Sequence, residues 1–93
     1  MKPISLLLLS ITLSGAVHAA LPGDAAEGQR LHDVNCLKCH DAGVYAKERR
    51  QIRSLDALRE RIGGCTHMAG ADFSPEQSQS VLKYLNERFY RLP

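Results

Sequence analysis

The sequence places two cysteines and a histidine together as Cys36-Leu37-Lys38-Cys39-His40. Two thiols separated by two residues can each form a thioether with one of the two vinyl groups on one porphyrin edge. The imidazole that follows is then held under the iron, where it can coordinate the metal. The motif therefore predicts one covalent haem c, bound through Cys36 and Cys39, with His40 as the proximal iron ligand.

Two other kinds of chemistry use the same residue types. A redox-active Cys-x-x-Cys pair is typical of a strand-helix-strand unit, and this sequence has no strand signal. A structural zinc site is the second alternative, because thiolate and imidazole groups suit tetrahedral zinc. Its ligands would be Cys36, Cys39, Cys65 and either His67 or His40.

A second set of possible iron ligands lies within four residues, and it consists of Cys65, His67 and Met68. Each of these side chains can bind haem iron on the distal side. Methionine is the commoner ligand and needs no deprotonation, whereas ferric iron would stabilise a thiolate by neutralising its charge. Cys65 is also the thiol left over when haem takes two of the three cysteines. On the residues alone, all three remain candidates.

The first 19 residues have the pattern of an export signal. Lys2 precedes an apolar run from Ile4 to Leu13, and small residues follow up to Ala19. The run is too short to cross a hydrocarbon layer of roughly 30 Å, and no later segment is apolar enough to do so. We therefore expect cleavage near Ala19, with the bond after Ala20 as the alternative, and a periplasmic protein without a membrane span.

The predicted mature domain, 20–93, has 74 residues, which is 93 less 19. A core of this size rarely supplies more than roughly 3–5 kcal/mol, so such domains recruit disulfides, metals or cofactors. Without Lys2 the 12 basic residues fall to 11, against 10 acidic ones. Net charge therefore indicates no particular partner.

A basic run contains Lys47, Arg49, Arg50 and Arg53. These side chains could pair with haem propionates or dock on an acidic redox partner, but a solvated loop is the default interpretation. Because Tyr45 is the only aromatic residue beside the run, nucleic-acid binding has no support.

Two helices have clear starting signals. Asp24, with an acid three residues later, predicts a helix over 25–35. Ser74 as a cap, Pro75 in the first position and Gln77 returning to the cap predict the last helix. The apolar face of this last helix consists of Val81, Leu82, Leu85 and Phe89.

The middle of the chain gives weaker signals. Segment 41–53 is predicted to be a loop with one helical turn at most. Ser54 starts a second helix that Gly63-Gly64 is expected to end, because glycine readily takes the left-handed conformation. Segment 65–73 is then a loop, and the chain as a whole is predicted to be all-α, with three to four short helices.

The pattern Gly28-x-x-Leu31-His32-x-x-x-Cys36-x-x-Cys39-His40 resembles the opening of class I c-type cytochromes. The segment 81–86 is similar to their C-terminal helix. The resemblance implies a small cytochrome c fold in which the first and last helices cross, with Gly28 against Tyr84. His32 stands where the family usually has Phe or Tyr, and we interpret it as a packing substitute rather than a haem ligand.

The order of a basic loop, Ser54 opening a helix and Cys65 just past it resembles a minor subgroup of small class I cytochromes. In that subgroup the distal iron ligand is a cysteine thiolate, which favours Cys65, with Met68 as the alternative and His67 third. The implied function is electron transfer, at low potential if the ligand is a thiolate. No substrate is turned over, so no enzyme is predicted.

A different class of function is a haem protein that binds NO or CO, or senses redox state, when the distal bond breaks. The implied partner of an electron carrier is a redox protein, and the resemblance also allows a heterodimer with another small cytochrome.

Overall fold

The computed structural model describes residues 20–93, which form α-helices and one π-helical turn, with no strand in this part of the chain. The elements are α1 (Ala25–Asn35), α2 (Val44–Gln51), α3 (Leu55–Met68), α4 (Pro75–Leu85) and the π-helix η1 (Asn86–Tyr90). The all-α prediction is therefore confirmed. The predicted export signal lies outside the described residues. Within 20–93, no helix has the length and apolarity that crossing a membrane requires.

The predicted helix starts are confirmed by their hydrogen bonds. The carboxylate of Asp24 accepts from the backbone N–H groups of Ala26 and Glu27 at 3.0 and 3.3 Å. At α4, Ser74 and Gln77 exchange side-chain and backbone hydrogen bonds of 2.9 and 3.1 Å, which completes the predicted capping box. These side chains satisfy N–H groups that the first helical turn leaves free.

Two middle segments differ from the prediction. Segment 41–53 contains a true helix, α2, whose fully buried side chain is Tyr45. Because only one of the eight residues of α2 is buried, the sequence has almost no helical periodicity there. The helix is therefore stabilised by tertiary packing rather than by a local signal.

The glycine pair does not end α3, which continues through Gly63 and Gly64 to Met68. Both glycines are exposed, and the helix ends instead at Gly70, which has a φ of 68°. There the N–H groups of Gly70 and Ala71 donate to the carbonyls of His67 and Thr66 at 3.1 and 3.0 Å. This left-handed turn satisfies the last carbonyls of the helix.

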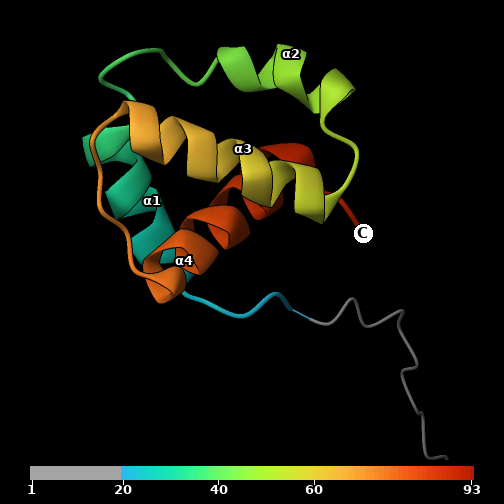
Figure 1. Ribbon diagram of the computed structural model, residues 1–93. Coiled ribbons are helices and arrows are strands. Elements are labelled where there is room, and N and C mark those ends of the chain that lie inside the picture. Colours follow the sequence, from blue (N-terminus) through green and yellow to red (C-terminus); the bar gives the residue numbers. More distant parts are fainter. Residues whose placement is uncertain (1–19) are drawn as a thin grey trace, which may run out of the picture.

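Helices α1 and α4 cross in direct backbone contact (Figure 1). A Cβ added to Gly28 would overlap the carbonyl of Ser80 and lie 3.0 Å from the Cβ of Tyr84. The meeting of Gly28 with Tyr84, which the sequence resemblance implied, is therefore observed. The backbone N–H of Asp24 also donates to the hydroxyl of Ser80 at 3.1 Å and so anchors the start of α1 on α4.

Helices α2 and α3 complete the fold by packing on the C-terminal helices. Figure 1 shows α2 above α3, with the chain between α1 and α2 passing the end of α3. Helix α2 packs on η1, where the Arg49 guanidinium donates to the carbonyl of Phe89 at 3.0 Å, and α3 packs on α4. The buried core of the described chain consists of Leu31, Tyr45, Ile52, Leu58, Ile62, Val81, Leu82, Leu85 and Tyr90. Of the apolar face predicted for the last helix, only Phe89 is partly exposed.

Candidate functional site

A narrow cavity between α2 and α3 brings the predicted site residues together. Cys36 and His40 approach it from the segment after α1, and Cys65 approaches it from α3. Four apolar side chains of α3 and α4 also line it, and these are Leu58, Ile62, Val81 and Leu85. The cavity therefore has a nitrogen donor and sulfur donors on an apolar wall.

The opposite walls of this cavity carry different donors. Tyr45 of α2 lies on the same side as His40, since the two rings meet edge to face with centroids 5.5 Å apart. Cys65 belongs to α3, which continues the other wall through Leu58 and Ile62. The cavity thus has an imidazole from the segment before α2 and a thiol from α3.

One ring nitrogen of His40 has a hydrogen-bond partner. Its Nδ1 lies 2.9 Å from the backbone carbonyl oxygen of Asp41. A hydrogen bond from Nδ1–H to this carbonyl leaves Nε2 as the free ligating nitrogen. Histidines that bind metals generally have such a partner on the second ring nitrogen.

Cys36 and Cys39 occupy the turn that directly follows α1. Cys36 is half-buried and is the cap residue of α1, whereas Cys39 is exposed. Both thiols line a second cavity that adjoins the first, together with Cys65 and Met68. The two thiols of the motif therefore lie beside the same cavity.

The three candidate distal ligands differ in their position on α3. Cys65 continues the buried stripe of Leu58 and Ile62, because spacings of three and four residues fall on one helix face. Met68 is three residues further along the same face, but its side chain is 86% exposed. His67 is exposed and lines neither of the two cavities.

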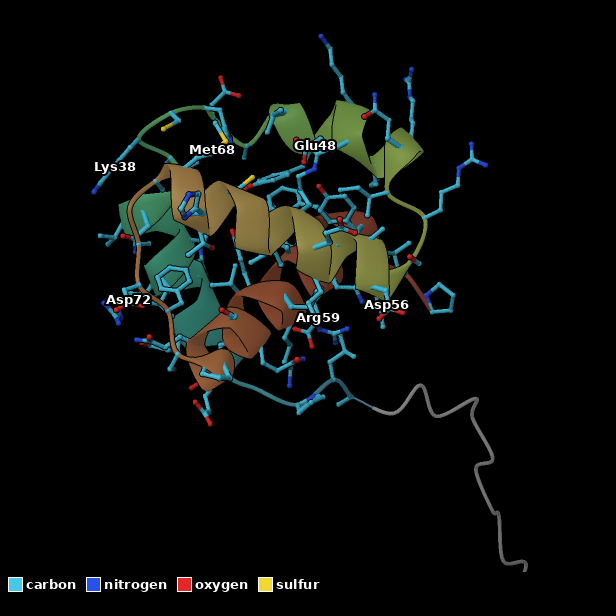
Figure 2. All side chains as sticks on the ribbon, in the orientation of Figure 1. Lys38, Glu48, Asp56, Arg59, Met68 and Asp72 are labelled. Atoms are coloured by element: carbon cyan, nitrogen blue, oxygen red, sulfur yellow. The ribbon has the colours of Figure 1, made fainter. Side chains whose placement is uncertain are left out.

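Figure 2 shows Met68 at the end of α3, beside the segment that precedes α2. Met68 therefore faces the outer cavity rather than the narrow inner one, which Cys65 lines. Of the three candidates, Cys65 lines both cavities, Met68 lines only the outer one, and His67 lines neither.

Burial also affects the thiols. It is the main cause that raises the pKa of Cys36, and nearby Cys65 adds to the effect. Burial likewise raises the pKa of Cys65, with a smaller contribution in the same direction from the carboxylate of Glu48. The positive charge of Arg61 opposes this increase. Both thiols are therefore protonated at neutral pH when no cation is bound.

Three polar side chains that the sequence analysis did not single out as site residues also line the cavity: Glu48, Arg61 and Tyr90. The hydroxyl of Tyr90 donates to the Glu48 carboxylate at 2.9 Å, and the Arg61 guanidinium lies 4.0 Å from it. Figure 2 shows Glu48 reaching from α2 towards α3. Arg61 precedes Cys65 by four residues. If the helix had been predicted to continue past the glycine pair, this spacing would have placed both residues on one face.

The basic run lies on α2 and just beyond it, rather than on a loop. Lys47, Arg49, Arg50 and Arg53 are all exposed. Their side chains make no ion pair within the described residues, and Arg53 donates to the backbone carbonyl of Arg50 at 3.3 Å. The face of α2 away from the cavity is therefore a solvated basic surface.

The zinc alternative has no preformed ligand cluster, because in residues 20–93 no three His, Cys, Asp or Glu side chains are placed to hold a metal ion. Comparisons of the chain with family models, with curated proteins and with solved structures find no match. The function must therefore be argued from the site itself.

Proposed function

We propose that this chain is an exported monohaem c-type cytochrome of the class I type that transfers electrons in the periplasm. The observation that carries the proposal is the convergence of Cys36, His40 and Cys65 on one apolar cavity between α2 and α3. A redox-active dithiol would need only Cys36 and Cys39. The imidazole of His40 and the third thiol, Cys65, are the additional groups that would hold a haem iron.

The residues fit haem c in their chemistry and order. Cys36 and Cys39 would bind the ring covalently, His40 would bind the iron through Nε2, and Cys65 would bind it from α3. Once bound, the haem would supply a metal centre that changes oxidation state by one electron. Because the cavity is narrow, haem binding would require α3 to move away from α2. Helices α2 and α3 meet through side chains, so they can part more easily than α1 and α4, which are in backbone contact.

The protein surroundings have two further effects on such a centre. The apolar wall excludes water and lowers the local dielectric constant, which strengthens the interaction of the iron with every nearby charge. Cys39 is exposed, so the thioether edge meets solvent and is the proposed site of electron exchange with a redox partner protein. A thiolate at position 65 would favour ferric iron and give a low potential.

The proposal is tested by expression in a host that performs covalent haem attachment. We expect the exported protein to have the mass of chain plus one haem and the absorption bands of a c-type cytochrome. Cys36→Ala and Cys39→Ala should each lower the yield of covalently loaded protein, whereas Lys38→Ala, in the same turn, should not. A wild-type product with only the mass of the bare chain would refute the proposal.

Addition of CO or NO to the reduced protein separates electron transfer from the alternative function of gas binding. A pure electron carrier should keep its spectrum unchanged, because both axial positions stay occupied. A new absorption spectrum that saturates with gas would favour the gas-binding function instead.

A further inference from the structure

Three side chains form a hydrogen-bonded chain from the surface of α1 to the wall of the cavity. Nδ1 of His32 lies 3.0 Å from Oδ1 of Asp33, and Nε2 of His32 lies 2.5 Å from the hydroxyl oxygen of Tyr45. An ionised carboxylate can only accept hydrogen bonds, so Nδ1–H donates to Asp33. In the tautomer with its proton on Nδ1, Nε2 accepts from the Tyr45 hydroxyl.

His32 is fixed in this chain by burial and packing. Its side chain is 1% exposed, and its ring lies between those of Tyr45 and Tyr84, with centroid distances of 5.5 and 5.4 Å. The packing role predicted for His32 is therefore confirmed. Packing alone does not explain the choice of residue, because a buried imidazole costs free energy unless both nitrogens find partners. Here both nitrogens have one.

Tyr45 connects this chain to the proposed proximal ligand. Its ring packs on Phe89 at 4.8 Å and meets the His40 ring at 5.5 Å, with the two planes 89° apart. Packing on Phe89 and the hydrogen bond to His32 fix the position of Tyr45 from two sides. Within residues 20–93, the one hydrogen bond of the His40 ring is to the carbonyl of its neighbour Asp41.

We propose that His32 is a positioning residue for the proximal iron ligand. Through its hydrogen bond it holds the ring of Tyr45 against His40 and so fixes the rotation of the His40 imidazole about the iron–nitrogen bond. This inference rests on the proposed function, because it gives His40 a metal. Partners outside the ligand shell commonly set the orientation of metal-bound imidazoles in this way.

The contact between Tyr45 and His40 should survive haem binding. Both residues lie on the wall formed by α2 and the segment before it, and a porphyrin would separate this wall from α3. The chain from Asp33 to Tyr45 involves α1 and α2 only, so a displacement of α3 does not interrupt it.

The experiment compares the ferric holoprotein with its His32→Phe variant by electron paramagnetic resonance and by NMR of the His40 ring protons. Phenylalanine fills the space but leaves the Tyr45 hydroxyl buried without an acceptor. We expect changed g-value anisotropy, shifted His40 resonances and a lower melting temperature.

A second variant separates positioning from stability. In the double variant His32→Phe with Tyr45→Phe, the stranded hydroxyl is gone, so the melting temperature should return most of the way to wild type. The spectroscopic signature of His40 should stay shifted, because the ring at position 45 is no longer tethered. Tyr84→Phe, which keeps the ring on the other face of His32, should leave the signature unchanged.

The outcomes that contradict the proposal are distinct. If the His40 signature of His32→Phe equals that of wild type, His32 has only a structural role. The same conclusion follows if the signature recovers together with the melting temperature in the double variant. A shift of equal size in Tyr84→Phe would also overturn the positioning role. A wild-type protein without covalent haem would overturn both this inference and the proposed function.

Discussion

The crossing of α1 with α4 and the cavity between α2 and α3 are held together in different ways. At the crossing, the backbone at Gly28 touches the backbone at Ser80, so not even a methyl group fits between the helices. At the cavity, α2 and α3 are joined through side chains, by Glu48 and Arg61 at 4.0 Å, and Glu48 also accepts a hydrogen bond from Tyr90 of η1. The crossing is therefore a close backbone contact, whereas the proposed haem insertion would require the side-chain contacts between the cavity walls to part.

The substitution expected to change the free energy of unfolding most is Gly28→Ala, at the crossing of α1 with α4. The added Cβ overlaps the Ser80 carbonyl, and because backbone cannot move aside as a side chain does, the crossing must open. We expect a loss of about 3 kcal/mol in the free energy of unfolding, the upper part of the usual range for overpacking. Denaturant unfolding of the holoprotein measures it. A loss below about 1 kcal/mol would mean that the crossing is no more rigid than the cavity walls.

The next prediction concerns the α3 wall. Cys65→Ser should change the spin state of the iron and raise the midpoint potential by a sizeable part of the roughly 0.8 V that axial ligands span. Met68→Ala is the matched control, since it removes a sulfur from the same helix face but from an exposed side chain, and it should change neither property. Absorption spectra and redox titration are the measurements. The reverse pattern would assign the distal position to Met68.

A smaller loss of stability is expected when Glu48, which lines the cavity, loses a hydrogen-bond donor. Tyr90→Phe removes the hydroxyl that donates to this carboxylate at 2.9 Å. Thermal unfolding should show a loss of about 1 kcal/mol, the usual net value of one such hydrogen bond. The His40 resonances should stay in place, because Tyr90 has no hydrogen bond to Tyr45 or His40. If they move as in His32→Phe, the special role of the Asp33–His32–Tyr45 chain is contradicted.

The smallest expected effect has the opposite sign. Gly63→Ala in the middle of α3 should raise the free energy of unfolding by about 0.5–1 kcal/mol, because alanine loses less conformational freedom in a helix. A Cβ at Gly63 meets no atom within 4 Å. This variant is also the counterpart of Gly28→Ala, since the same substitution is expected to stabilise one region and destabilise the other. A destabilised Gly63→Ala protein would show that α3 does not continue through the glycine pair.

The two regions also differ in how far the sequence predicts them. Asp24, Ser74 and Gln77 act through neighbours two or three positions away, so their caps are visible in the local sequence. The Cys36 to His40 motif is equally local.

The α2–α3 region depends instead on distant partners. Helix α2 forms because Tyr45 packs on η1, and Gly63-Gly64 stay helical because Leu58, Ile62 and Cys65 continue one buried face. Glu48 and Arg61 become site residues only when both helices are in place, so local patterns could not identify them. The packing of His32 was predicted from the sequence, but its hydrogen bond to Tyr45 was not, because Tyr45 lies 13 positions away.

The position of Cys65 in the last turn of α3 has an electrostatic consequence. The aligned peptide dipoles of a helix place a partial negative charge at its carboxyl end, equivalent to roughly half an elementary charge. A metal bound to Cys65 would lie at that end of α3, so the backbone itself would favour the more positive oxidation state. The helix direction would therefore lower the reduction potential in addition to any effect of the sulfur ligand.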